Sequence, residues 1–183
     1  MTQNLVITTL GSDRPGICNQ VVRLVTQSGC NIVDSRIALF GNEFTLVMLL
    51  SGSNQAVTRI ETMLPLLGQE HDLITMSKRT SPHQYHDNTY TVEVFVEAED
   101  RIGLTEKFTQ FFADRHIDLG SLSSQILLKE KLQSRHDLCH MNLTATLTAE
   151  HDPQQLQLDF DALCSQLNVQ GSLRFIQTNP HKL

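Results

Sequence analysis

The hydrophobic and polar positions of the first half of the chain change period in a definite order. Apolar residues first alternate with polar ones, as in a strand with one buried face, and then recur every three or four residues, as in an amphipathic helix. Two further strands are joined by Gly41 and Asn42, a dipeptide typical of hairpins, and a second helix and a last strand follow. The predicted order is βαββαβ. Its strands are expected at residues 5–10, 32–40, 44–50 and 73–78, and its helix faces are Ile17, Val21, Val22 and Val25, then Val57, Ile60, Leu64 and Leu67.

The second half of the chain repeats this order. Short connections and right-handed crossovers then predict, in each half, a four-stranded antiparallel sheet with both helices on one face. The fold class is therefore α+β, with two ferredoxin-like domains in tandem. The second set of strands is expected at residues 91–98, 122–128, 138–147 and 173–176, with helix faces of Leu104, Phe108, Phe111 and Phe112, then Leu156, Phe160, Leu163 and Leu167.

A short motif indicates that the two halves are copies of one unit. The sequence DRPGI at residues 13–17 returns as DRIGL at residues 100–104, an offset of 87, and the strand before it matches at the same offset. Further along, Leu73 is matched with Leu173 at an offset of 100. The second copy is therefore expected to carry insertions between its middle strands and beyond.

We predict a first domain at residues 1–80, a polar, Pro-containing linker at 81–88 and a second domain at 89–183. Residues 44–50 are apolar on both faces of their strand, so the face turned away from the helices needs a cover. The cover could be the other copy, a second subunit in a homo-oligomer, or a partner protein. We favour the other copy, because a short linker gives it a high effective concentration. Residues 138–147, in contrast, alternate cleanly and predict one wet face.

The charges and the lack of certain segments exclude several kinds of partner. The chain has 14 Lys and Arg against 20 Asp and Glu, a net charge of -6, and all the excess acidity lies in the second half. Direct nucleic-acid binding is not expected, because it needs clustered basic residues, and no helix-turn-helix pattern is present. No apolar run approaches a membrane span and no signal segment precedes the first strand, so we expect a cytoplasmic protein without membrane contact.

No catalytic site, metal site or cofactor is predicted. The four cysteines lack C-x-x-C spacing and are interpreted as free thiols, most of them buried. They are Cys18, Cys30, Cys139 and Cys164. His136 and His140 would lie about 13 Å apart on an extended strand, too far for one metal ion. No nucleophile or acid/base grouping is recognisable, so we expect no enzymatic activity.

The loop between the first strand and the first helix is the candidate binding site. Ser12 or Asp13 is placed to cap the helix, Pro15 lies near its first position, and Gly16 leaves backbone amides uncovered. Such a helix start can hold the carboxylate of a ligand, with help from the helix dipole. A well-capped helix after a tight turn would explain the same residues without a ligand.

Asn31 opens the second strand, and its amide could orient the ammonium group of a ligand if this strand start lies beside the loop. Carboxylate and ammonium are the two groups by which a free amino acid is recognised. A residue that ends the turn after a helix would explain Asn31 by itself. The complete candidate site is Gly11, Ser12, Asp13, Arg14, Pro15, Gly16, Asn31 and Ile32.

These residues resemble a known family. The βαββαβ order, the DRPG loop and the Gly-x-Asn-Ile entry to the second strand are similar to the ACT domain, a regulatory module that binds amino acids. The tandem pair, with GCNI, DSRIA and GNEFTLVMLLSG, resembles the glycine cleavage system transcriptional repressors over nearly the whole chain, most closely over residues 5–80. The resemblance implies a cytoplasmic repressor that binds the LysR-type activator of the glycine cleavage operon when glycine is scarce, and that glycine releases.

The second copy departs from this pattern. Its equivalent, degenerate site is Asp100, Arg101, Gly103 and Asp118. Pro15 is replaced by Ile102, and Asn31 by Asp118, which would suit an ammonium group but repel a carboxylate. The alternative function is an amino-acid-binding regulatory subunit of a metabolic enzyme, because ACT modules commonly flank catalytic domains.

Overall fold

The chain forms two compact units, residues 1–84 and 85–183. The computed structural model describes residues 2–81, 88–128 and 136–177. The boundary between the units falls inside the segment that the sequence marks as a linker, and most of that segment lies outside the described residues.

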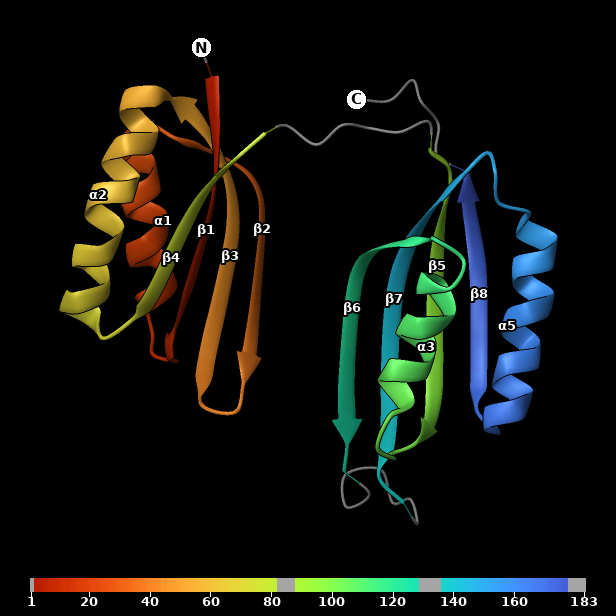
Figure 1. The fold of residues 1–183 in the computed structure, drawn as a ribbon. Coiled ribbons are helices and arrows are strands. Elements are labelled where there is room, and N and C mark those ends of the chain that lie inside the picture. The colour runs from red at the N-terminus through yellow and green to blue at the C-terminus, as the bar shows by residue number, and fades with distance from the viewer. Residues whose placement is uncertain (1, 82–87, 129–135, 178–183) are drawn as a thin grey trace. The chain divides into compact units, whose positions relative to one another are not determined.

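Unit 1 folds in the order that the sequence predicts (Figure 1). Its elements are β1 (Thr2–Ser12), α1 (Ile17–Ser28), β2 (Asn31–Phe40), β3 (Glu43–Ser53), α2 (Asn54–His71) and β4 (Ile74–Thr80). The strands pair antiparallel in the order β2-β3-β1-β4, and both helices pack on one face of the sheet.

Unit 2 has the same topology, with strand order β6-β7-β5-β8. Its elements are β5 (Asn88–Glu99), α3 (Leu104–Ala113), β6 (Asp118–Leu127), β7 (Leu138–Thr148), α5 (Pro153–Leu167) and β8 (Gln170–Gln177). The predicted fold class, two ferredoxin-like α+β units in tandem, is confirmed.

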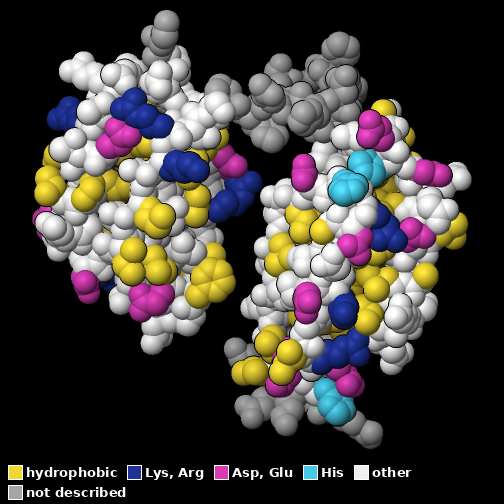
Figure 2. Space-filling view, viewed as in Figure 1, with side chains coloured by type: hydrophobic (Ala, Val, Ile, Leu, Met, Phe, Trp, Pro, Cys, Tyr) yellow, Lys and Arg dark blue, Asp and Glu magenta, His cyan; other side chains and the backbone are white. Residues whose placement is uncertain are grey.

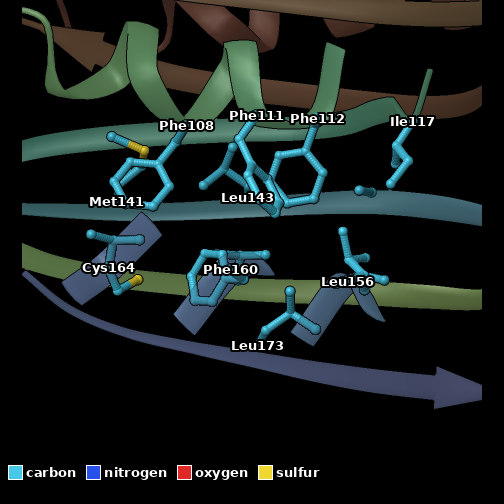
Figure 3. Packing of buried hydrophobic residues seen from close by; sticks show 14 of the residues in the cluster. Phe108, Phe111, Phe112, Ile117, Met141, Leu143, Leu156, Phe160, Cys164 and Leu173 are labelled. Atoms are coloured by element: carbon cyan, nitrogen blue, oxygen red, sulfur yellow. The ribbon is translucent and has the colours of Figure 1, made fainter. Parts of the chain in front are cut away.

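Each unit has its own core between the sheet and the helices. Every residue of the predicted helix faces is buried in these cores or packs against them. In unit 2 the rings of Phe108 and Phe111, from α3, meet the ring of Phe160, from α5, at centroid distances of 5.9 and 6.0 Å (Figure 3). A fully buried side chain of this kind contributes about 1.5–3 kcal/mol by leaving water.

In both units a glycine lets the second helix approach the last strand. In unit 1 this glycine lies on the helix, whereas in unit 2 it lies on the strand. In unit 2 the small residue is Gly171 on β8, where a methyl group would lie 2.5 Å from the Cys164 Sγ of α5. In unit 1 it is Gly68 on α2, where a methyl group would lie 3.0 Å from the Thr75 Cγ2 of β4. The helix and the strand therefore pack closely when one of them carries a glycine and the other a larger side chain at the point of contact, whichever of the two carries the glycine.

The strand registers correct the sequence alignment of the two copies. Leu10 pairs with Ile74 in unit 1, and Glu97, which is 87 residues after Leu10, pairs with Gln170 in unit 2. The offset at the last strands is therefore 96, and the predicted match of Leu73 with Leu173 is wrong. Leu173 lies inside β8 opposite Val94, whereas Leu73 precedes β4. Leu73 and Leu173 are both apolar, so the sequence alone could not distinguish the alignment with an offset of 100 from the one with an offset of 96.

Both edge strands next to the central hairpins carry an irregularity at the same place. The register of β2 against β3 shifts at Val33, and the register of β6 against β7 shifts at Gly120, 87 residues later. Each shift is a β-bulge, which adds one unpaired residue and increases the local twist of the strand.

The sheet face that turns away from the helices differs between the units. In unit 2 its β7 positions are polar, as the alternation of β7 predicts, and it carries Glu93, Asn142 and Thr144, with Phe95 and Ile176 as exposed apolar residues on the same face. In unit 1 the same face carries Val47, which is exposed, and Leu49, which is half-buried. The cover predicted for this face of unit 1 stays a prediction.

Candidate functional site

The loop between β1 and α1 is held by backbone geometry and not by a side-chain cap. Helix α1 begins at Ile17, after Gly16 with φ 87°, and no side chain accepts a hydrogen bond from its first amides. The predicted cap is therefore wrong. The Ser12 hydroxyl instead donates to the Glu43 carboxylate (3.3 Å), and the Asp13 amide donates to the Asn42 carbonyl (2.9 Å). The Ile17 amide donates to the Arg14 carbonyl (3.2 Å), and the next amides of α1 remain open to an acceptor from outside.

Arg14 joins this loop to the far end of the second helix. Its Nη2 donates to the carbonyl of His71, the last residue of α2, over 2.7 Å. In unit 2 the equivalent Arg101 Nη2 donates to the carbonyl of Leu167, the last residue of α5, over 2.5 Å. A cation at a helix C-terminus stabilises the unsatisfied carbonyls there. The arginine of the repeated motif therefore has a structural role in both copies.

A hollow of about 300 Å³ lies against the loop of unit 1. Four of the predicted site residues line it, together with four residues that the sequence analysis did not select. The predicted four are Asp13, Arg14, Pro15 and Gly16, and the others are Ile17, Cys18, Ile37 and Phe44. The hollow thus combines a helix N-terminus with an apolar wall from α1, β2 and β3. This arrangement suits the carboxylate and the short aliphatic part of a small amino acid.

Gly11 and Ser12, two more of the predicted residues, do not line the hollow. Gly11 is buried, and a methyl group there would lie 2.6 Å from the Leu73 Cδ2. Its absent side chain allows β1 to pass close to the residue before β4. Both residues position the loop through packing and hydrogen bonds with neighbouring strands.

Asn31 and Ile32 lie at the opposite end of the sheet. Asn31 pairs with Ser51 on β3, whereas Ser12, at the loop, pairs with Glu43. The eight residues between these two positions of β3 span about 27 Å at 3.4 Å per residue. The prediction that Asn31 lies beside the loop is therefore wrong within one unit, because β2 begins far from the loop and only ends near it.

The equivalent loop of unit 2 is similar in backbone and different in charge. The Asp100 amide donates to the Asp137 carbonyl (2.9 Å), and Gly103 has φ 87°. Glu106 stands in the first turn of α3, whereas no acidic residue stands in the first turn of α1. A methyl group on Gly103 would lie 3.8 Å from the Glu106 Oε2, so this helix start already has a carboxylate nearby.

Asp118, the last residue of the predicted second site, pairs with Thr146. Glu99, at the loop of unit 2, pairs with Leu138, which is eight residues away from Thr146 on β7. Asp118 therefore lies about 27 Å from its loop, as Asn31 does in unit 1. Neither strand start joins the loop of its own unit.

Ile37 and Cys18 are the lining residues that sequence reasoning could have found. Ile37 is apolar and exposed, although it pairs with buried Leu46 on β3. Cys18 is half-buried in the first turn of α1. Both residues are apolar but lie outside the predicted helix faces, and this was the signal in the sequence that could have marked them as lining residues.

A second hollow, of about 470 Å³, lies on the helix-free face of unit 2 and is lined by Glu93, Phe95, Asn142 and Arg174 among others. On the same face the His140 Nε2 lies 2.7 Å from the Glu97 Oε2. Among the described residues no group of three or more His, Cys, Asp or Glu side chains could hold a metal ion. Within the same residues no helix is long and apolar enough to cross a membrane.

The fold and the loop of unit 1 define an ACT domain, and the ACT domain family matches residues 3–78 of the chain. With the same topology in unit 2, the protein is a tandem ACT-domain regulator. The glycine cleavage system transcriptional repressor of Escherichia coli K12 is 42% identical over 177 residues, which cover 97% of this chain and 92% of that repressor. The chain belongs to the family of the glycine cleavage system transcriptional repressors, and its role is regulatory and not enzymatic.

Solved structures agree with this assignment. The crystal structure of a protein provisionally assigned as a glycine cleavage system transcriptional repressor is 60% identical, covers 97% of this chain and 99% of its own, and has a TM-score of 0.72. A protein of unknown function from Galdieria sulphuraria has a TM-score of 0.75 over 96% of this chain and 99% of its own. At 21% identity it shows the fold alone.

Proposed function

We propose that this protein represses the glycine cleavage operon by binding its LysR-type activator in the cytoplasm, and that glycine or a similar small amino acid relieves the repression. The repressor relatives support the operon and the direction of control. The net charge of -6 supports a protein partner over direct contact with DNA, because DNA phosphates attract clustered positive charge.

The observation that carries the effector site is the uncapped start of α1 at the 300 Å³ hollow. A glycine carboxylate would accept hydrogen bonds from the amides of Cys18 and Asn19, because the Ile17 amide already donates to the Arg14 carbonyl. Ile37 and Phe44 would border its small aliphatic part. Asn31 would take part only if it came from another unit or chain, since its own strand starts about 27 Å away. Unit 2 would bind the effector weakly or not at all, because Glu106 repels a carboxylate.

Isothermal titration calorimetry with glycine tests the site. Asn19→Glu places a carboxylate in the first turn of α1 at the position of Glu106 in α3, and an acidic residue there does not weaken a helix. We expect glycine binding to weaken at least about tenfold. Gln27→Glu, which adds the same charge near the end of α1, is the matched control and should bind like the wild type. Equal binding by the wild type and Asn19→Glu would contradict the site.

Electrophoretic mobility shifts test the mode of repression. The purified protein alone should not shift operator DNA at physiological salt, and adding it to the activator–DNA complex should change the mobility of that complex. Millimolar glycine should restore the mobility of the activator alone. A specific shift by this protein without the activator would contradict repression through a partner.

A further inference from the structure

The hollow of unit 1 offers one acidic side chain to a ligand. Of its eight lining residues, Asp13 alone carries a carboxylate and Arg14 alone carries a cation. The Asp13 backbone amide holds the loop by donating to the Asn42 carbonyl (2.9 Å), whereas no described residue pairs with the Asp13 carboxylate. The fold therefore does not use this carboxylate, which is exposed and free to take a cation from outside.

An amino acid in this hollow needs a partner for its ammonium group, because an unpaired charge loses the stabilisation that water gives it. Asn31 cannot be that partner within one unit, since its strand starts about 27 Å from the loop. The lining side chains other than Asp13 and Arg14 are apolar or absent, apart from the thiol of Cys18, which is a weak acceptor. Asp13 is therefore the side chain in the hollow that matches an ammonium group.

The same loop holds the partners of a carboxylate. The amides of Cys18 and Asn19 are open, because the Ile17 amide already donates to the Arg14 carbonyl. The guanidinium of Arg14 is held at the loop by its hydrogen bond to the His71 carbonyl (2.7 Å) and has further N–H donors. Figure 2 shows acidic and exposed hydrophobic side chains gathered at the end of unit 1 where the β1–α1 loop and the β2–β3 hairpin lie. Both charged groups of an amino acid and its aliphatic part therefore have partners at this end of the unit.

The loop of unit 2 provides a comparison, because it repeats the acidic and basic residues as Asp100 and Arg101. Glu106 adds a second carboxylate in the first turn of α3, where unit 1 has the neutral Asn19. An ammonium group would meet two acidic side chains there, and a carboxylate would be repelled. Unit 1 therefore suits both charged groups of an amino acid, whereas unit 2 suits only a cation.

We propose that Asp13 binds the ammonium group of the effector, which makes the hollow of unit 1 selective for zwitterionic amino acids over simple carboxylates. The inference rests on the proposed function, because it concerns the same hollow and the same effector. The effector carboxylate accepts from the amides of Cys18 and Asn19, and its ammonium group donates to Asp13. Arg14 offsets the repulsion between Asp13 and the effector carboxylate. Both charged residues are exposed, so salt screens the selectivity.

Nuclear magnetic resonance titrations of the full chain compare glycine with acetate, which carries a carboxylate and no ammonium group. The amide signals of Cys18 and Asn19 report binding. We expect the wild type to bind glycine at least about fivefold more tightly than acetate. Asp13→Asn should lose most of this preference, because glycine binding weakens while acetate binding stays equal or becomes tighter once the repelling charge is gone. The matched control is Asp72→Asn, which removes an exposed carboxylate at the same end of unit 1, at a φ of 55° that asparagine tolerates, and should bind both ligands like the wild type.

The opposite responses of the two ligands separate binding by Asp13 from an effect on the shape of the loop. Equal weakening of glycine and acetate binding by Asp13→Asn would show that the residue only shapes the loop, and would overturn the inference alone. Equal glycine binding by the wild type and Asp13→Asn, or the same loss in Asp72→Asn, would overturn it as well. A wild type that binds neither ligand would overturn the proposed effector site together with the inference. If Asp13→Asn does not fold by circular dichroism, Asp13→Ala replaces it, because the loop is held by the backbone amide of this residue.

Discussion

The exchanged pair of small and large residues between the last strand and the second helix gives a sharp test of packing. In unit 2, Gly171→Thr would introduce a side chain whose first carbon lies 2.5 Å from the Cys164 Sγ and 2.9 Å from the Phe160 Cζ. Favourable carbon contacts lie at about 3.5–4.0 Å, so an overlap of about 1 Å must be relieved against a fully buried ring. Overpacking of this kind costs about 1–3 kcal/mol, and threonine belongs at the upper end because it adds two further atoms.

The compensating change is Cys164→Gly, which recreates the pair that unit 1 holds at Gly68 and Thr75. By itself it costs about 1–2 kcal/mol through a less favourable helix residue and a lost buried sulfur. If the two changes acted independently, the double variant would lose about 4–5 kcal/mol. We expect it to lose about 3–4 kcal/mol, less than that sum, because the glycine on the helix removes the contact with the Cys164 Sγ, whereas the contact with the Phe160 ring, whose unit 1 equivalent is Leu64, remains.

Thermal unfolding followed by circular dichroism measures these differences. A loss of about 3 kcal/mol lowers the Tm of a domain of this size by roughly 12–24 °C, so Gly171→Thr should show a distinct early transition for unit 2. Ser172→Thr, an exposed neighbour on β8, is the control and should change stability by less than about 0.5 kcal/mol. The reasoning fails if Gly171→Thr is as stable as the wild type, or if the double variant loses the full sum.

The remaining predictions concern titratable groups. Burial, together with the nearby charge of Asp161, raises the pKa of the Cys164 thiol to about 11. The half-buried Cys18 should therefore react with iodoacetamide at pH 8 well before Cys164 in the native protein. Equal reaction rates of the two thiols, measured by peptide mass spectrometry, would contradict this expectation. The Arg79 guanidinium holds the pKa of Glu61 below its usual value, so this pair contributes stability above the unfolded pKa of about 4.3 and loses it as the pH falls through the folded pKa. The Tm difference between the wild type and Glu61→Gln should therefore be largest at neutral pH and shrink below about pH 4, and a constant difference would argue against the pair.

Most of the fold could be predicted from the sequence, because the pattern of buried residues follows one period in strands and another in helices. The alternation of β7 and the helical spacing of α1 place their apolar residues in the cores of unit 2 and unit 1, respectively. The repeated motif at residues 13–17 supports the prediction of two copies of one fold, since its glycine has a positive φ in both copies. These features are local, and local periodicity is what a sequence records directly.

The candidate site was predicted only in part, because it depends on distances through space. The four loop residues 13–16 line the hollow, but the prediction about Asn31 placed a strand start beside a loop that lies at the other end of the sheet. Ile37, which does border the hollow, is near the end of the same strand. The predicted cap also failed, because the residue at the N-cap position is Gly16, which has no side chain, and the Ser12 hydroxyl instead donates to the Glu43 carboxylate.

The bulges at Val33 and Gly120 have a consequence for the behaviour of the protein at high concentration. Each lies in an edge strand, where unpaired backbone groups could otherwise accept a strand from another molecule and start a growing stack. A continuous run of such pairing would be interrupted at the bulge, since one residue has no partner opposite it. Both sheets therefore carry, at matching positions, a barrier to fibre formation that costs neither unit its hydrophobic core.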